Sequence, residues 1–330
     1  MIAASMIFLI CNAEQSLGFA TEAVEMCVTS LIPSLFPFMF FSTLLSSVLL
    51  GCHFRSFRIL SKLCRIPNGS EILLILGSLG GYPVGAQMIS NAYQNGQLKR
   101  EDAQRILGFC NNAGPAFIFG ILGPAFESGI IPALLWLIQI ISAVITGILL
   151  KGRCADKISI QQQRKISVTT ALEKSVRSMG LICGWVLLFK IVVGFVKQFT
   201  HAFLPEYMSV ILTGMLELTN GCFALYEIEC IGARFVLSAL LLSAGGLCVA
   251  LQTVTAVSPL RLRRYFVGKC IQTITSTMLA LIAQSLIFSP ASQIRIPNLQ
   301  MILIAFSVFI SIILIYYKKT VAFRDNLVYN

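Results

Sequence analysis

Long apolar blocks without charged residues constrain this chain more than any other feature of its sequence. Residues 31–50 and 130–150 are uncharged blocks, each of about 20 residues, the length that spans a hydrocarbon layer of ~30 Å. Residues 299–317 form a third block, which Lys318 and Lys319 close. Only helices and closed barrels satisfy every backbone group in lipid, and these blocks lack the alternation of barrel strands. The sequence therefore predicts an all-α, multi-pass membrane helix bundle.

The composition supports this class. Hydrophobic residues make up 56% of the 330 residues and charged residues only 12%, whereas soluble domains carry about 25% charged residues. The net charge of +11 lies mostly between the apolar blocks, which is typical of loops that face a cytoplasm and anionic lipid. No stretch mixes basic and aromatic residues as a nucleic-acid surface does, so no nucleic acid is expected as a partner.

The chain divides into two membrane repeats. The first covers residues 1–150, a basic linker covers 151–177, and the second repeat covers 178–330. The linker carries seven Lys and Arg against two acids, which predicts that it is cytoplasmic. In a helix over residues 53–66, the cationic side chains lie on one face and the apolar side chains cover the rest, which predicts an amphipathic helix at the membrane interface. Residues 1–11 are apolar but short, which favours a truncated first segment over a signal peptide.

The two halves look related. Residues 78–87 align with 243–252, at an offset of 165 residues, through matching Ser, Gly, Gly, Val and Gln. Weaker matches pair 23–48 with 171–196 and 107–110 with 267–270. Repeats with Gly- or Pro-broken segments at corresponding positions are typical of secondary transporters and point to the binding site. We therefore include Gly245 and Gly246 among the candidate site residues.

Two segments of the first half, 72–90 and 106–126, contain helix breakers. In the first, glycines allow a tight turn and proline can start a returning helix, which predicts the tip of a re-entrant hairpin; the residues are Gly80, Gly81, Tyr82, Pro83 and Gly85. Free N–H groups at such a helix start suit a carboxylate or phosphate. The alternative is that these glycines only allow close packing of helices.

The second broken segment contains Asn111, Asn112 and Gly114. Two adjacent amides inside a membrane segment predict a discontinuous helix that presents them to a solute; the alternative is that each bonds a neighbouring helix. Gln87 and Gln252 occupy equivalent positions of the two repeats, and we expect them to face one another across the site.

The second half carries Glu217, Thr219 and Asn220 inside the apolar stretch 208–225. Acids inside a membrane are functional candidates by default, so we expect Glu217 to bind a proton or coupling cation; an interfacial position is the alternative. If 208–225 crosses the membrane fully, both broken hairpins enter from the same face. If it is re-entrant, they enter from opposite faces and Arg261, Arg263 and Arg264 lie outside.

The sequence predicts no enzyme. The eleven cysteines form no CxxC pair, and His53 and His201 are far apart, so neither a metal site nor a nucleophile with a nearby base is expected. A Walker loop is also absent from the sequence, which argues against ATP hydrolysis. We expect no catalytic residue, metal or cofactor.

Two motifs carry a family resemblance. Residues 80–87 (GGYPVGAQ) and 110–115 (CNNAGP), supported by 35–38, 217–221 and 243–246, resemble the sporulation integral membrane proteins of the YlbJ type, which belong with the nucleoside-recognition or Gate domain proteins. The resemblance covers nearly the whole chain, except that the first membrane segment is short.

The resemblance implies a membrane protein of spore-forming bacteria that moves dipicolinic acid, a pyridine dicarboxylate. Its expected partners are membrane lipid and a small anionic solute, with self-association into a homo-oligomer left open. Two alternatives stand beside it: a transporter of nucleosides or other small solutes, and a membrane assembly factor of the spore envelope that transports nothing.

Overall fold

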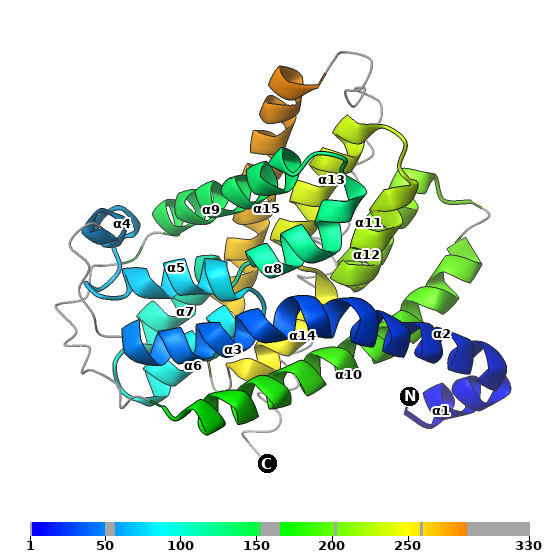
Figure 1. Ribbon diagram of the computed structural model, residues 1–330, viewed down its shortest axis with the longest axis horizontal. Coiled ribbons are helices and arrows are strands. Elements are labelled where there is room, and N and C mark those ends of the chain that lie inside the picture. The colour runs from blue at the N-terminus through cyan, green and yellow to red at the C-terminus, as the bar shows by residue number, and fades with distance from the viewer. Residues whose placement is uncertain are drawn as a thin grey trace.

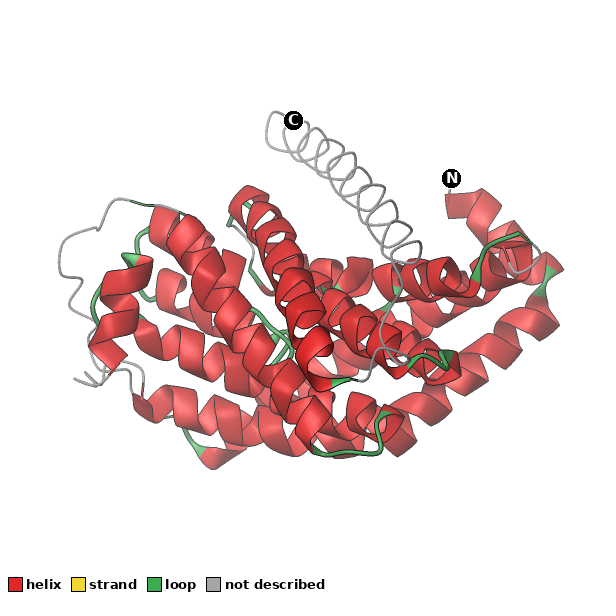
Figure 2. Ribbon diagram, turned by 90° about the horizontal axis from the view of Figure 1, so that it is seen from above, coloured by secondary structure: helices red, strands yellow, loops and turns green. Residues whose placement is uncertain are grey.

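The computed structural model describes residues 2–49, 57–150, 152, 166–200, 203–257 and 260–288. Within these ranges the regular structure is helical, without a strand (Figures 1 and 2). The helices before the central gap are α1 (Ile2–Cys11), α2 (Ala13–Met26), π-helix η1 (Cys27–Leu31), α3 (Ile32–Leu49), α4 (Arg58–Cys64), α5 (Glu71–Gly80), α6 (Val84–Gln94), α7 (Arg100–Cys110), α8 (Pro115–Phe117), η3 (Ile118–Leu122), η4 (Gly123–Ala125) and α9 (Ile130–Leu149). Those after it are α10 (Val168–Thr200), α11 (Glu206–Leu216), α12 (Leu218–Ala224), η5 (Leu225–Glu227), α13 (Ile231–Ala244), α14 (Gly246–Ala256) and α15 (Arg263–Ile287).

Six helical stretches in the described part of the chain are long and apolar enough to cross a membrane. They are Ala13–Leu49, Arg100–Ala125, Ile130–Leu149, Val168–Thr200, Ile231–Ala256 and Arg263–Ile287. The predicted all-α membrane bundle is therefore confirmed. The span predicted at 31–50 begins earlier, because α2 runs through η1 into α3, and the block 299–317 lies outside the described residues.

Two long helices cross the whole molecule beside each other. α2 and α3 form one, α10 forms the other, and α10 packs against both (Figure 1). α15 packs against α7, α9 and α13. The short helices α5 to α8 and α11 to α14 therefore lie among long spans, and their broken ends are buried.

Both short helix pairs are hairpins that turn back on themselves. α5 and α6 meet at Gly81, which has a φ of 74°, a conformation that glycine adopts without strain. α11 and α12 meet at Glu217, which is extended between them. Gly221 packs directly on the backbone of Gly214 in the opposite arm. The stretch 208–225 thus turns back on itself at Glu217 and is not one continuous helix, which favours the re-entrant alternative.

The other two breaks interrupt long spans. Residues 111–114 run extended between α7 and α8, and Gly245 and Gly246 separate α13 from α14 with φ values of 75° and 74°. Gly245 lies beside the hydroxyl of Tyr82, because a Cβ added to Gly245 would be 3.2 Å from that oxygen. The first hairpin tip and this break therefore lie close together, although residues 84–85 and 246–250 are helical.

The same order of elements occurs in both halves: a long span, a hairpin, a broken span and a second long span. In the first half these are α3, α5–α6, α7–α8 and α9, and in the second α10, α11–α12, α13–α14 and α15. By this order of elements, the hairpin tip at Gly81 corresponds to the hairpin tip at Glu217. The sequence match of 78–87 with 243–252 instead pairs the first hairpin with the broken span α13–α14, so the two correspondences disagree. Glycines recur at both kinds of break, so matching glycines does not distinguish them.

At the edge of the bundle, the helix expected over 53–66 is seen as the short α4, and residues 53–56 lie outside the described ranges. Arg105 fixes the end of α4, since its guanidinium donates to the carbonyls of Cys64 and Arg65 at 2.9 and 2.5 Å. In the linker, residues 168–177 already belong to α10.

We expect Gly77→Ala to destabilise the protein, because a Cβ at Gly77 would collide with the carbonyl oxygen of Cys110. Overpacking of this kind costs about 1–3 kcal/mol. Gly180→Ala is the matched control, since its Cβ would meet nothing within 4 Å. Thermal unfolding of the purified variants in detergent measures both, and equal midpoints for Gly77→Ala and Gly180→Ala would show that the first hairpin is not packed as described.

Candidate functional site

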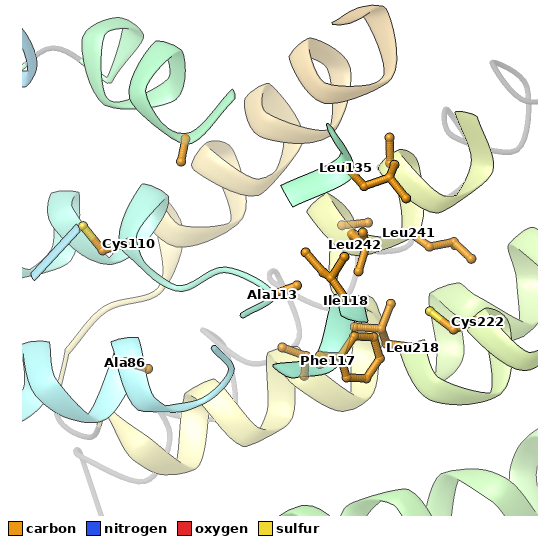
Figure 3. Close-up of a cluster of buried hydrophobic side chains, with 14 of the residues drawn as sticks. Ala86, Cys110, Ala113, Phe117, Ile118, Leu135, Leu218, Cys222, Leu241 and Leu242 are labelled. Carbon is orange, nitrogen blue, oxygen red and sulfur yellow. The ribbon is translucent and has the colours of Figure 1, made fainter. Parts of the chain in front are cut away.

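A pocket lies where the two hairpins and the two broken spans meet. Both hairpin tips contribute to it, through Gly80, Gly81 and Tyr82 from the first and Glu217, Leu218 and Thr219 from the second. The broken spans add Ala113, Gly114, Ala116, Phe117, Val249 and Gln252, and the long helices add Leu31, Leu35, Ile182 and Val186. Figure 3 shows the extended chain after Cys110, with Phe117 beside Leu218 at one wall.

The pocket is narrow in this conformation. It leaves about 40 Å³ for the centres of water-sized molecules, and one water needs roughly 10–15 Å³ by this measure. A few water molecules fit, whereas a solute with two carboxylates does not fit unless a tip moves. The central pocket, as we call it below, is therefore closed.

Glu217 is buried at the second tip and caps α12. One carboxylate oxygen accepts from the backbone N–H of Thr219 at 3.0 Å. The other accepts from the backbone N–H and the side-chain amide of Asn220, at 2.7 and 2.8 Å. Glu217 is 2% exposed, so it lies inside the helix bundle. Its negative charge is bound by the first turn of its own helix.

A buried lysine stands directly behind the first tip. Lys269, on α15, is 2% exposed, and its ammonium donates to the hydroxyl of Tyr82 at 2.8 Å and to Oε1 of Gln272 at 3.0 Å. The Asn112 side-chain oxygen lies 3.4 Å away, and the ammonium is 4.9 Å from the centre of the Tyr82 ring. Tyr82 in turn donates to the carbonyl of Leu242 at 3.1 Å.

All of these partners of Lys269 are neutral. The ion pairs among the described residues join Arg105 to Asp102 and Lys190 to Glu22, and neither includes Lys269. Removing an ion from water costs several kcal/mol even after relaxation, and neutral acceptors offset only part of that cost. The site therefore places a lysine amine without an acidic partner among the described residues next to Tyr82, which lines the central pocket.

The two adjacent asparagines bond protein, not the pocket. Asn111 accepts from the backbone N–H of Ala86 at 3.3 Å and donates to the hydroxyl of Thr253 at 2.9 Å. Asn112 donates to the carbonyl of Phe109 at 2.8 Å and accepts from the amide of Gln272 at 2.8 Å. Neither lines the central pocket, so bonding to neighbouring segments, the alternative considered for them, describes both in this structure.

The structure thus separates the predicted site residues into two groups. Those that line the central pocket are Gly80, Gly81, Tyr82, Gly114, Glu217, Thr219 and Gln252. Those that do not line it are Pro83, Gly85, Gln87, Asn111, Asn112, Asn220, Gly245 and Gly246. The expectation that Gln87 and Gln252 face one another is wrong, because Gln87 donates to Ser178 at 2.8 Å and lines a different cavity.

Lys269 is not among the predicted site residues, because in the sequence it closes a basic stretch that begins at Arg261. A signal for it was present. One face of α15 is polar and buried, and its residues recur at helical spacing: Lys269, Gln272, Thr273 and Ser276. A polar face on an otherwise apolar membrane span usually faces the interior of the bundle. Among the described residues, no group of three His, Cys, Asp or Glu side chains could hold a metal ion.

The comparisons with known proteins agree with this architecture. The chain is 28% identical over 134 residues to the sporulation integral membrane protein YlbJ of Bacillus subtilis (strain 168). The match covers 38% of this chain, and the chain spans about a third of that relative, 32% of its length. No protein-family model and no solved structure matches. With its six apolar helices, this chain is a multi-pass membrane protein similar to the sporulation integral membrane proteins of the YlbJ type.

Proposed function

We propose that this protein carries a small anionic solute across a membrane during spore formation, with the central pocket as its binding site. The observation that carries the proposal is the buried Lys269, which has only neutral partners and bonds the tip residue that lines this pocket. The name of the curated relative supports the sporulation context. The family resemblance adds dipicolinic acid as the candidate solute.

A lysine without an acidic partner favours an anion in the pocket. Glu217 also lines the pocket, but its carboxylate accepts three hydrogen bonds from Thr219 and Asn220 at the start of α12, whereas Lys269 has no acidic partner among the described residues. An anion bound in the pocket would lie near Lys269, with Tyr82 between them. The free energy of burying two opposite charges together is far less unfavourable than that of burying either charge alone. A dicarboxylate carries two charges, so further donors are needed; the Gln252 amide also lines the pocket.

The arrangement of the hairpins favours transport over static binding. Two re-entrant tips of different halves close on one pocket from different sides, as in transporters whose site lies between two repeats. Because the closed pocket holds only a few water molecules, a dicarboxylate requires one tip to withdraw. Movement of one tip at a time would expose the pocket to one side of the membrane and then to the other.

Uptake into liposomes that contain the purified protein tests the proposal. Labelled pyridine-2,6-dicarboxylate, simple dicarboxylates and nucleosides are offered separately. We expect uptake of an anion above that of protein-free liposomes. Uptake of nucleosides alone would favour the neutral-solute alternative. No uptake of any of them, by protein that is folded by size-exclusion chromatography, would favour the assembly factor.

The first prediction concerns Lys269→Met. Removing the amine removes the basic group next to the pocket, so anion uptake should fall at least about tenfold, the equivalent of 1.4 kcal/mol. Lys269→Arg keeps the charge and should retain part of the uptake. Lys197→Met, in the last turn of α10, is the matched control and should transport normally. If Lys269→Met folds and transports as the control does, the lysine is structural and the anion site lies elsewhere.

The second prediction concerns coupling through Glu217. In Glu217→Gln the amide oxygen can still accept a hydrogen bond from a backbone N–H at the start of α12. The amide has no negative charge, so it cannot bind a proton or a metal cation as a carboxylate does. We expect this variant to lose the response of uptake to a proton or cation gradient, each imposed separately on the liposomes. Identical responses of the wild type and the variant to both gradients would mean that Glu217 only caps α12.

A further inference from the structure

A second, larger cavity lies beside the first hairpin and is lined by the end of α3 and the start of α10. Figure 1 shows these helices. The cavity leaves about 230 Å³ for the centres of water-sized molecules, against about 40 Å³ in the central pocket. Its lining comes from α3, α6 and the start of α10, namely Thr43, Ser46, Ser47, Val84, Gln87, Met88, Asn91, Ile166, Lys174, Arg177, Ser178 and Leu181. We call it the outer cavity.

The outer cavity combines a polar inner wall with two cations. Ser47 and Ser178 are 5% and 6% exposed, and Ser178 accepts a 2.8 Å hydrogen bond from the Gln87 amide. Polar side chains that line a cavity inside a membrane bundle are hydrated or bind a ligand. The hydroxyls of Thr43, Ser46 and Ser47 already donate to backbone carbonyls of α3. The groups of this wall that can donate to an anion are therefore the Ser178 hydroxyl and the second N–H of the Gln87 amide.

The cations are Lys174 and Arg177, one helical turn apart on α10, so they project to the same side of the helix. No acidic residue belongs to the described lining of the cavity, and the ion pairs within the described ranges include neither cation. Both side chains are exposed. An arginine and a lysine beside the Ser178 hydroxyl and the Gln87 amide form a donor set that binds carboxylate and phosphate.

The position of the outer cavity links it to the first hairpin. Tyr82 lines the central pocket, whereas Val84 and Gln87, on the first turn of α6, line the outer cavity. The two linings share no residue, and Pro83 alone separates their nearest members in the sequence.

We propose that the outer cavity is a second anion-binding site, in which Lys174 and Arg177 hold a carboxylate or phosphate group and Gln87 and Ser178 form its inner end. A soluble anion and the headgroup of an anionic lipid share this chemistry. The site stands whether or not the central pocket transports a solute.

Protection of Lys174 from chemical modification tests this proposal. The full-length protein is placed in nanodiscs of neutral lipid and treated with a water-soluble amine-acylating reagent, and the modification rate of each lysine is measured by mass spectrometry. Pyridine-2,6-dicarboxylate and inorganic phosphate are added separately. A second set of nanodiscs contains phosphatidylglycerol and no added anion. Lys197, on the same helix but outside the cavity, is the internal reference.

We expect a several-fold slower modification of Lys174, with Lys197 unchanged. Protection by an added anion in neutral lipid identifies a soluble ligand, and protection only by phosphatidylglycerol identifies a lipid headgroup. Arg177→Gln should weaken the protection, whereas Arg263→Gln, an exposed charge outside the cavity, should leave it intact. Gln252→Leu, in the central pocket, should also leave it intact, which separates this site from the proposed transport site.

The proposal is overturned if Lys174 is modified at the same rate with and without each anion and in both lipids. It is also overturned if Arg177→Gln and Arg263→Gln reduce the protection equally, because the effect would then follow the net charge and not the cavity.

Discussion

The structure depends on pairing the backbone groups that its four breaks release inside an apolar bundle. An unpaired N–H or C=O in lipid costs several kcal/mol, and at each break a polar side chain takes up such a group. Asn111 accepts from Ala86 in the first turn of α6, and Asn112 donates to Phe109 in the last turn of α7. Tyr82 bonds the end of α13 through Leu242, and Glu217 bonds the start of α12. Many of the polar residues that mark the breaks in the sequence therefore cap the ends of helices in this structure.

This capping leaves few groups free for a ligand. Both asparagines and the Glu217 carboxylate are already bonded to protein. Lys269 is different, because its partners are neutral acceptors and its charge is not neutralised by any of them. The same asymmetry, cations without acidic neighbours, recurs at Lys174 and Arg177 in the outer cavity.

Close packing of glycines makes the buried hairpins compact enough to fit between long spans. Gly85 lies so near α7 that a Cβ would be 2.5 Å from the carbonyl oxygen of Cys110, and one on Gly246 would be 2.6 Å from that of Gly214. The two roles considered for the glycines of the first half, turning the chain and packing helices, are therefore both present at different positions. Gly81 turns the chain with a positive φ, whereas Gly77 and Gly85 bring the hairpin against α7.

The sequence by itself determined the class of this protein, the all-α membrane bundle, and located the breaks near Gly81, Asn111 and Gly245. It left open whether the chain turns back at Glu217 or crosses the membrane there. These predictions rest on local signals, namely long uncharged segments, glycine, proline and amide side chains within them. Each signal reflects whether one stretch of backbone can remain helical in lipid. The tertiary structure decided which breaks correspond, which side chains face the central pocket, and that Gln87 and Gln252 line different cavities. It also brought Lys269 from another helix to Tyr82, across 187 residues of chain. Such partnerships depend on how the helices pack and rotate against each other, and no local pattern of residues encodes that.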